Sequence, residues 1–235
     1  MKLIVAGATG FVGKEVIRQS LSRHEITSVV AVARKPVSAP DNLDAGADPS
    51  KLRSVVVRDY DDYSEEVKRD FADAGACIWT VAVTPTKSRA YDFEEVKRIC
   101  QTSALTGLRA MHDAGPAKPK PFRFLYMSGA MVEREPAKKP WFMPEYSLMR
   151  GETETEVLAL ATELGGVEAA CVRPGLIVAP GEIMKSVVSS VLGGLTGIPS
   201  IALGDLTAVM LDQVIEGFEK EPLMPRDLAR LVKER

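Results

Sequence analysis

The feature that most constrains the fold is a closely spaced set of three glycines near the N-terminus. An apolar segment, Lys2–Ala6, leads directly into Gly7-Ala8-Thr9-Gly10-Phe11-Val12-Gly13, and apolar side chains then recur at helical spacing. In such a strand–turn–helix, Gly7 makes the tight turn, Gly10 admits a ligand close to the backbone and Gly13 lets the helix pack on the strand. The free amides at a helix N-terminus attract a pyrophosphate. The sequence therefore predicts a dinucleotide site at this turn.

Short apolar segments alternate with helical ones along the rest of the chain. The pattern predicts further strands at residues 28–33, 55–57, 76–83, 122–127 and 167–172, and helices at residues 64–72, 91–112 and 146–164. Strands that are apolar on both faces are typical of a parallel sheet covered by helices on both sides. We therefore expect an α/β fold, a doubly wound parallel sheet (Rossmann fold) in one domain over residues 1–235. Residues 130–145 and 176–235 are expected to form the substrate side, the latter as a small C-terminal cap.

Composition narrows the classes of function. The 235 residues include 30 basic and 32 acidic ones, and the net charge of −2 gives no indication of a nucleic-acid partner. Cys77, Cys100 and Cys171 are widely spaced and lack histidine neighbours, so we expect neither a metal site nor a disulfide framework. No uninterrupted apolar stretch is long enough to span a bilayer, and the apolar stretch 183–195 is interpreted as a pocket wall or oligomer contact. These features predict a cytoplasmic monomer or homodimer that acts on a small molecule without a membrane partner.

The end of the second predicted strand bears on which dinucleotide binds. NAD-binding chains usually place Asp or Glu about 20 residues after the glycines, where the carboxylate accepts hydrogen bonds from the ribose. Arg34 and Lys35 stand at that position in this chain, with no carboxylate beside them. A guanidinium can hold a 2′-phosphate in bidentate fashion and stack on adenine. The sequence therefore favours NADP(H) as the cofactor, the alternative being a surface arginine at a strand end.

Several motifs together resemble the short-chain dehydrogenase/reductase superfamily. The chain is most similar to its atypical branch, which includes Tat-interacting-protein-like and NmrA-like proteins. The segments that carry the resemblance are GATGFVG (7–13), VARK (32–35), RDYDDY (58–63), FLYMSGA (124–130), YSLMRGETE (146–154), VRPGLI (172–177) and GDLTAVMLDQVI (204–215). The resemblance implies a Rossmann fold and an NADP(H)-dependent oxidoreductase acting on a small carbonyl or alcohol.

The resemblance also implies a set of site residues by matching position. Ser128, Tyr146 and Arg150 fall at the family's catalytic positions. The cofactor would contact the glycine turn and Arg34 and Lys35, with Asp59 and Tyr60 flanking the adenine and Ala82, Val83 and Thr84 lining its inner side. Arg150, Pro174, Gly175, Leu176 and Ile177 would lie beside the nicotinamide and its ribose.

The chemistry of this set depends on Tyr146 and Arg150, which lie one helical turn apart on the same face. In the family, the tyrosine protonates the carbonyl oxygen as hydride arrives, and a nearby cation stabilises the phenolate. Free tyrosine has a pKa near 10, so this cation is needed. Arg150 stands where the family has lysine, and it keeps the charge but effectively never deprotonates. Ser128 is expected to hold the substrate oxygen.

Two features leave alternatives open. Trp141 and Phe142, in a proline-rich loop, either cover an apolar and aromatic substrate or anchor the loop to the body. The short segment after Gly175 argues against sugar-nucleotide substrates. The change from lysine to Arg150 also leaves room for an NADPH-binding regulatory or sensor protein, or for a redox-neutral isomerase on the same scaffold.

Overall fold

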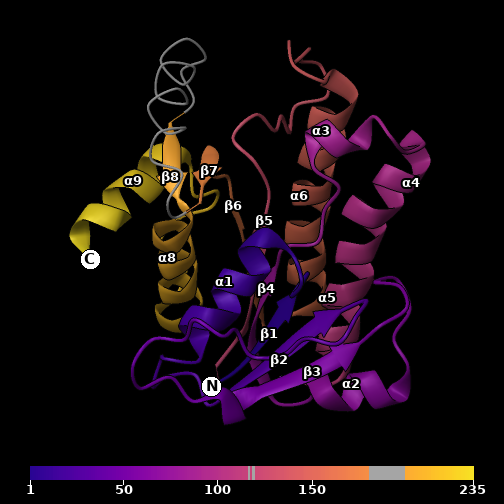
Figure 1. Cartoon of the computed structure of the whole chain (residues 1–235). Helices are drawn as coiled ribbons and strands as arrows, with labels where there is room; N and C mark the ends of the chain where they lie inside the picture. The colour runs from indigo at the N-terminus through magenta and orange to yellow at the C-terminus, as the bar shows by residue number, and fades with distance from the viewer. Residues whose placement is uncertain (116, 118–119, 180–198) are drawn as a thin grey trace.

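The computed structural model describes residues 1–115, 117, 120–179 and 199–235, so the apolar stretch 183–195 lies outside the described residues. A parallel sheet with the strand order β3-β2-β1-β4-β5-β6 runs through the centre of the molecule (Figure 1). Its strands are β1 (Lys2–Ala6), β2 (Ser28–Ala33), β3 (Leu52–Val56), β4 (Ala74–Trp79), β5 (Phe122–Met127) and β6 (Val167–Val172). The predicted doubly wound Rossmann fold is confirmed.

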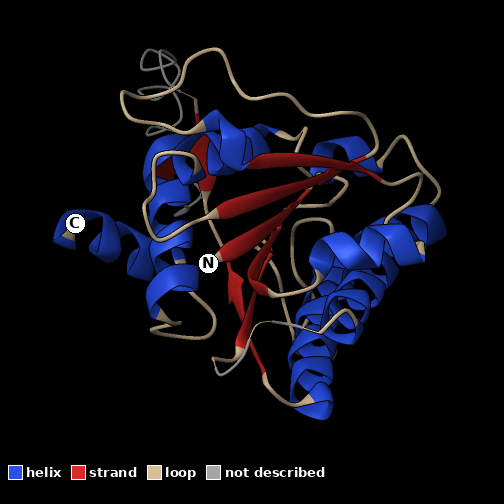
Figure 2. Cartoon of the chain, turned by 90° about the horizontal axis from the view of Figure 1, so that it is seen from below, coloured by secondary structure: helices blue, strands red, loops and turns tan. Residues whose placement is uncertain are grey.

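Helices cover both faces of the sheet, as Figure 2 shows. One face carries α1 (Phe11–Ser20), α8 (Leu203–Glu216) and α9 (Pro225–Glu234), and the other carries α2 (Glu65–Phe71), α5 (Ser103–Asp113) and α6 (Pro144–Leu164). Strand β1 shows why, because Leu3 and Val5 belong to one apolar cluster while Ile4 and Ala6 belong to the other. Successive side chains of a strand point to opposite faces, so a strand without polar residues needs cover on both.

The strand order reverses beside β1, which pairs with β2 on one side and β4 on the other. In open parallel sheets, ligands bind outside the carboxyl ends of the strands at this reversal. The glycine turn follows β1 there, so the topology places the predicted dinucleotide site where the fold can hold one.

Two predicted strands differ from the structure at their ends. β3 begins at Leu52 rather than residue 55, because it is an edge strand whose exposed Arg53 and Ser54 interrupt the apolar pattern. β4 ends at Trp79 rather than residue 83. The Thr80 amide and hydroxyl both donate to Ala6 O, and the chain then leaves the sheet toward the carboxyl-end crevice.

The helical segments also differ in detail. The helix predicted over 91–112 consists of α4 (Phe93–Lys97), a π-helical turn (Arg98–Thr102) and α5. α6 begins at Pro144, which sequence analysis had placed in a loop, since proline is favoured in the first helical turn. No helix among the described residues has both the length and the apolar character needed to cross a membrane.

Several small elements were not predicted. They are a short 3₁₀ helix (Pro49–Lys51), α3 (Pro85–Ser88), and the parallel pair β7 (Leu176–Val178) and β8 (Ser200–Ala202). Figure 1 shows β7 and β8 beyond the edge of the main sheet, close to α9. Their three-residue strands are too short to give a recognisable pattern.

The contrast between two helical glycines provides a test of this packing. A Cβ on Gly107 of α5 would lie 2.3 Å from Cζ3 of the fully buried Trp79, whereas a Cβ on Gly204 of α8 would lie 3.7 Å from its nearest atom. We expect Gly107→Ala to destabilise the protein by about 1–3 kcal/mol through overpacking. Gly204→Ala should be neutral or stabilise it by up to about 1 kcal/mol. Urea denaturation of both variants measures the difference, and equal effects would contradict the packing of α5 on Trp79.

Candidate cofactor and active site

The backbone of the glycine turn packs closely against neighbouring atoms. Gly7 has a φ of +83°, and a Cβ there would lie 2.5 Å from Thr80 Oγ1. A Cβ on Gly13 would lie 2.3 Å from Gly7 O, so only glycine lets α1 approach the end of β1 this closely. Gly10 is the N-cap of α1 and supplies no side-chain cap. The amides of the first helical turn therefore have no side-chain acceptor at the cap, and the turn fits a pyrophosphate.

Arg34 and Lys35 follow β2 and are both exposed. No ion pair between described residues involves either of them. Burial raises the pKa of Tyr60 to about 12, and the Gly7 backbone and the charge of Arg34 act in the opposite direction. That hydroxyl donates to Val32 O at 3.2 Å, at the end of β2. Arg34 thus projects from the carboxyl end of β2, beside the glycine turn that follows β1.

The residues expected at the adenine occupy different environments. The Tyr60 ring is buried and meets Trp79 edge-on, with centroids 5.9 Å apart. Asp59 keeps a partly exposed carboxylate, which accepts from Arg98 Nη1 at 2.7 Å. Arg98 lies in the π-helical turn and also pairs with Asp61. The structure therefore leaves Asp59 accessible and packs most of Tyr60 into the core.

A cavity of about 460 Å³ opens beside the glycine turn at the carboxyl ends of the strands. It brings together residues that are far apart in the sequence, including all three predicted catalytic residues. Its lining consists of Phe11, Ala82, Thr84, Pro85, Met127, Ser128, Gly129, Ala130, Met131, Val132, Phe142, Tyr146, Ser147, Arg150, Pro174, Gly175, Leu176 and Ile177. Both segments expected on the substrate side contribute to this lining, and most of the lining side chains are apolar.

The two aromatic residues of the loop after β5, Trp141 and Phe142, occupy different environments. Phe142 lines the cavity, whereas Trp141 is 77% exposed and is absent from the lining. Their ring centroids lie 5.7 Å apart. The structure thus separates the pair that sequence analysis treated together, because consecutive loop side chains point in different directions.

Tyr146 and Arg150 lie on the first turns of α6, against the cavity. The Tyr146 hydroxyl donates to Val83 O at 2.7 Å. Burial raises the pKa of Tyr146 to about 12, and the nearby charge of Arg150 acts in the opposite direction. The hydroxyl is therefore protonated at neutral pH, as a proton donor must be. Val83 does not line the cavity, and it contributes to the site by accepting this hydrogen bond at its carbonyl oxygen.

Arg150 is only 3% exposed, and its surroundings hold the guanidinium in place. Nη2 donates to Met127 O at 2.7 Å, and Cζ lies 4.8 Å from the centroid of the Tyr126 ring. Nη1 is buried and has no hydrogen-bond partner within the described part of the chain. An unsatisfied buried guanidinium nitrogen is costly, so this nitrogen marks a place where a ligand oxygen would be stabilised.

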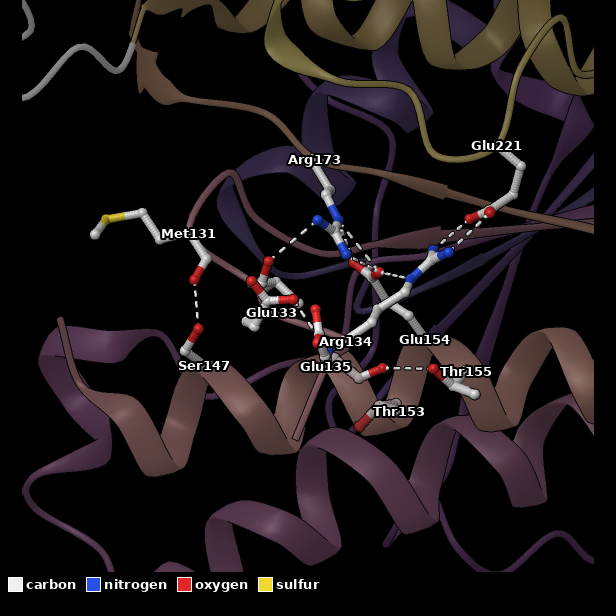
Figure 3. A network of polar contacts seen from close by, with 12 residues as sticks. Met131, Glu133, Arg134, Glu135, Ser147, Thr153, Glu154, Thr155, Arg173 and Glu221 are labelled. Atoms are coloured by element: carbon white, nitrogen blue, oxygen red, sulfur yellow. Dashed lines mark hydrogen bonds and ion pairs between the residues drawn. The ribbon is translucent and has the colours of Figure 1, made fainter. Parts of the chain in front are cut away.

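A buried ion-pair network lies behind the cavity wall (Figure 3). Glu154 of α6 has no exposed surface and accepts from Arg134 Nε at 2.6 Å and from Arg173 Nε at 2.9 Å. Arg134 also pairs with Glu221, in the segment before α9, with Nη1 and Oε2 2.9 Å apart. Arg173 further donates to Val132 O at 3.1 Å. The network joins the loop after β5, helix α6, the end of β6 and the C-terminal segment.

Ser128 lies between the cavity and this network. Its hydroxyl oxygen is buried and completes no hydrogen bond of normal geometry with the described residues. Burial alone would raise the pKa of Glu154, but Arg173, Ser128 and Arg134 together hold it below its usual value. Ser128 itself belongs to the lining of the cavity.

Sequence analysis missed this network and the glycine that accommodates it. A Cβ on Gly151 would lie 1.8 Å from Glu133 O, so the loop after β5 can rest on α6 only over a glycine. The signal was present in the segment YSLMRGETE, where Glu154 follows Arg150 by one helical turn. Neither partner of Glu154 is near it in the sequence, so the pairing itself could not be predicted. Among the described residues, no three His, Cys, Asp or Glu side chains are grouped as metal ligands.

A family model described as NAD(P)H-binding matches residues 7–215, from the first glycine of the turn to the last turn of α8. The chain belongs to this NAD(P)H-binding family. The predicted resemblance to NAD(P)-binding Rossmann-fold reductases is thereby confirmed. A comparison with curated proteins finds no match.

Solved structures with the same fold include three that are informative. MoeE5 in complex with UDP-glucuronic acid and NAD is 17% identical, with a TM-score of 0.66 over 94% of this chain and 74% of that one. DesIV, a dTDP-glucose 4,6-dehydratase from Streptomyces venezuelae with NAD bound, is 18% identical, with a TM-score of 0.67 over 100% and 80%. The PhqB reductase domain from Penicillium fellutanum is 15% identical, with a TM-score of 0.67 over 95% and 66%. At these identities the likeness shows the fold.

The Glu154 network predicts a specific loss of stability in this NAD(P)H-binding protein. Glu154→Gln leaves Arg134 and Arg173 with one buried carboxylate fewer, and we expect a loss of about 3–5 kcal/mol at neutral pH. The matched variant Glu221→Gln removes a partly exposed partner of Arg134 and should cost about 1 kcal/mol or less. Denaturant titration measures both values, and equal losses would contradict the central position of Glu154.

The same network fixes the sign of a pH effect. Because the folded state lowers the pKa of Glu154, its stabilising contribution is complete above the usual value of 4.5 and is lost as the pH falls through the lowered value. The wild-type protein should therefore lose stability faster than Glu154→Gln over this acid range.

Proposed function

We propose that the chain is an NADP(H)-dependent oxidoreductase that acts on a small, apolar carbonyl compound or the corresponding alcohol. The observation that carries the proposal is the position of Tyr146 and Arg150 against one apolar cavity, which also reaches Phe11 in the glycine turn. The residues proposed as the proton donor and its cation thus line the same cavity as a residue of the glycine turn. The surrounding side chains of Met127, Val132 and Leu176 favour an apolar substrate.

NADP(H) is the proposed form of the cofactor. When bound, its nicotinamide supplies or accepts a hydride. The glycine turn would bind the pyrophosphate, and Arg34 with Lys35 would bind the 2′-phosphate, as the absence of a carboxylate after β2 supports. Pro174, Gly175, Leu176 and Ile177 would shape the nicotinamide side of the cavity.

Tyr146 would donate its hydroxyl proton to the substrate carbonyl oxygen during reduction. For this the hydroxyl exchanges its hydrogen bond to Val83 O for one to the substrate. The charge of Arg150 stabilises the phenolate that remains. Since Arg150 cannot itself give up a proton, Tyr146 is reprotonated from water. Ser128, which also lines the cavity, would donate a hydrogen bond to the same substrate oxygen.

Arg34 provides a test of the cofactor. Arg34→Ala should weaken NADPH binding roughly ten- to hundredfold, which corresponds to the loss of charge-assisted hydrogen bonds, and should leave NADH binding almost unchanged. Isothermal titration calorimetry with both cofactors measures this. A matched control is Arg69→Ala, which removes an exposed charge near the end of α2. The adjacent Asp70 pairs with Arg53 at the start of β3, so Arg69 lies toward the amino ends of the strands, away from Arg34. Equal losses for NADPH and NADH would refute the assignment.

Tyr146→Phe tests the reaction. The variant lacks the proton donor but keeps the ring, so the turnover of carbonyl reduction should fall by a factor of about 10²–10⁴ while the Kd for NADPH stays within a factor of about two. Because the pKa of Tyr146 is about 12, the wild-type rate of reduction should not decline as the pH rises through neutrality. A variant that retains full turnover would exclude Tyr146 as the donor.

A second candidate function is an NADPH-binding regulatory protein. It is favoured by one observation, that the Tyr146 hydroxyl donates to Val83 O rather than pointing freely into the cavity. A protein that binds NADPH tightly, oxidises it with none of a broad panel of ketones and keeps its cellular role as Tyr146→Phe would be such a sensor. The isomerase alternative predicts turnover without net change in NADPH absorbance.

A further inference from the structure

We infer that the substrate site continues past Tyr146 into a second cavity, which takes the aromatic far end of an elongated carbonyl substrate. This cavity has a volume of about 280 Å³, and its lining includes Arg89, Tyr91, Phe93, Met143, Glu145 and Tyr146. The inference rests on the proposed function, since it assigns the reacting carbonyl to the first cavity.

Tyr146 is the residue that the two cavities share, because it lines both of them. It lies in the first turn of α6, and Phe142 and Met143, just before that helix, line one cavity each. A molecule whose carbonyl oxygen meets the Tyr146 hydroxyl therefore has space on either side of the ring. The first cavity alone is adequate for a single-ring compound, and the second extends the site in one direction.

The second cavity presents aromatic surface that the fold leaves uncovered. Tyr91 is 53% exposed and Phe93 is 37% exposed, and neither ring stacks on another ring among the described residues. Isolated exposed aromatics are common, but here two from one short segment line the same hollow. Each ring would gain apolar contact from a flat ligand, and ring–ring contact favours an aromatic one.

The backbone that carries these rings is held in place. Tyr91 N donates to Ser88 O at 3.1 Å, and Phe93 begins α4, where Asp92 caps the helix by accepting from Glu94 N at 2.9 Å. Across the cavity, Met143 adopts a left-handed conformation, with φ 41° and ψ 64°. Such a conformation is unfavourable for a non-glycine residue and is concentrated at ligand sites. Ser147 N donates to Met143 O at 2.9 Å, which secures the turn into α6.

The charges of the lining restrict the ligand further. Arg89 and Glu145 contribute one charge of each sign, so the second cavity has no net charge to attract a phosphate. A nucleotide diphosphate would need a cluster of cations or free helix amides, and this lining supplies a single guanidinium. The occupant is therefore an uncharged aryl group, joined to the carbonyl by a linker that passes the Tyr146 ring.

A pair of ketones with the same reacting group tests the inference. Acetophenone fits the first cavity alone, whereas 4-benzyloxyacetophenone adds a second ring that would reach Tyr91 and Phe93. With NADPH at saturation, the wild-type protein should show a roughly tenfold lower KM for the longer ketone and a larger rise in Tm when it binds. The double variant Tyr91→Ala/Phe93→Ala should lose most of that difference while its KM for acetophenone stays unchanged.

Trp141→Ala is the matched control. Trp141 is an exposed aromatic residue of the neighbouring loop, and its side chain lines neither cavity. It should preserve the preference for the longer ketone. The inference is overturned if the double variant affects both ketones equally, if Trp141→Ala has the same effect, or if the longer ketone raises Tm no more than the shorter one. Failure of the proposed function is distinguishable, because neither ketone would then be reduced, while the comparison of Tm values would still report on the second cavity.

Discussion

Glu154 is a carboxylate with no exposed surface, and its charge remains buried because Arg134 and Arg173 both donate to it. A lone ionised carboxylate in such a place would be strongly destabilising, so these partners are required. They come from the loop after β5 and from the end of β6, and Arg134 extends the network to Glu221. Four segments at the carboxyl ends of the strands are thus fixed relative to one another by one buried charge.

The candidate active site depends on this arrangement. Arg150 lies one helical turn before Glu154 on α6, and Tyr146 lies one turn earlier still, so the network also fixes the helix that carries the proposed proton donor and its cation. The wall residues Met131 and Val132 accept from Ser147 and Arg173, respectively, through their carbonyls. The cavity is therefore bounded by backbone that the network and α6 hold, which is what a site needs to orient a small apolar substrate.

The fold could be read from the sequence almost completely, and the site only in part. The extents of β1, β2, β5 and β6 were predicted as observed, since uninterrupted apolar runs are a local signal. The errors fell on the edge strand β3, whose exposed Arg53 and Ser54 hide the pattern, on the bounds of β4, and on the short β7 and β8. At the site, the sequence predicted Tyr146 and Arg150 on one helical face. It did not predict that Tyr146 would donate to Val83 O, or that Trp141 and Phe142 would diverge.

The sequence by itself determined the doubly wound sheet and the tight glycine turn after β1, because glycine spacing and the two-residue period of strands act within a few residues of the chain. It also determined that Arg34 follows β2 where other chains place a carboxylate. Only the tertiary structure decided which side chains surround the candidate active site. Glu154 meets Arg134 and Arg173, and Tyr146 separates two cavities, because the strands end at one edge of the sheet and bring distant loops together there. Such contacts depend on the three-dimensional approach of side chains, which no local pattern encodes.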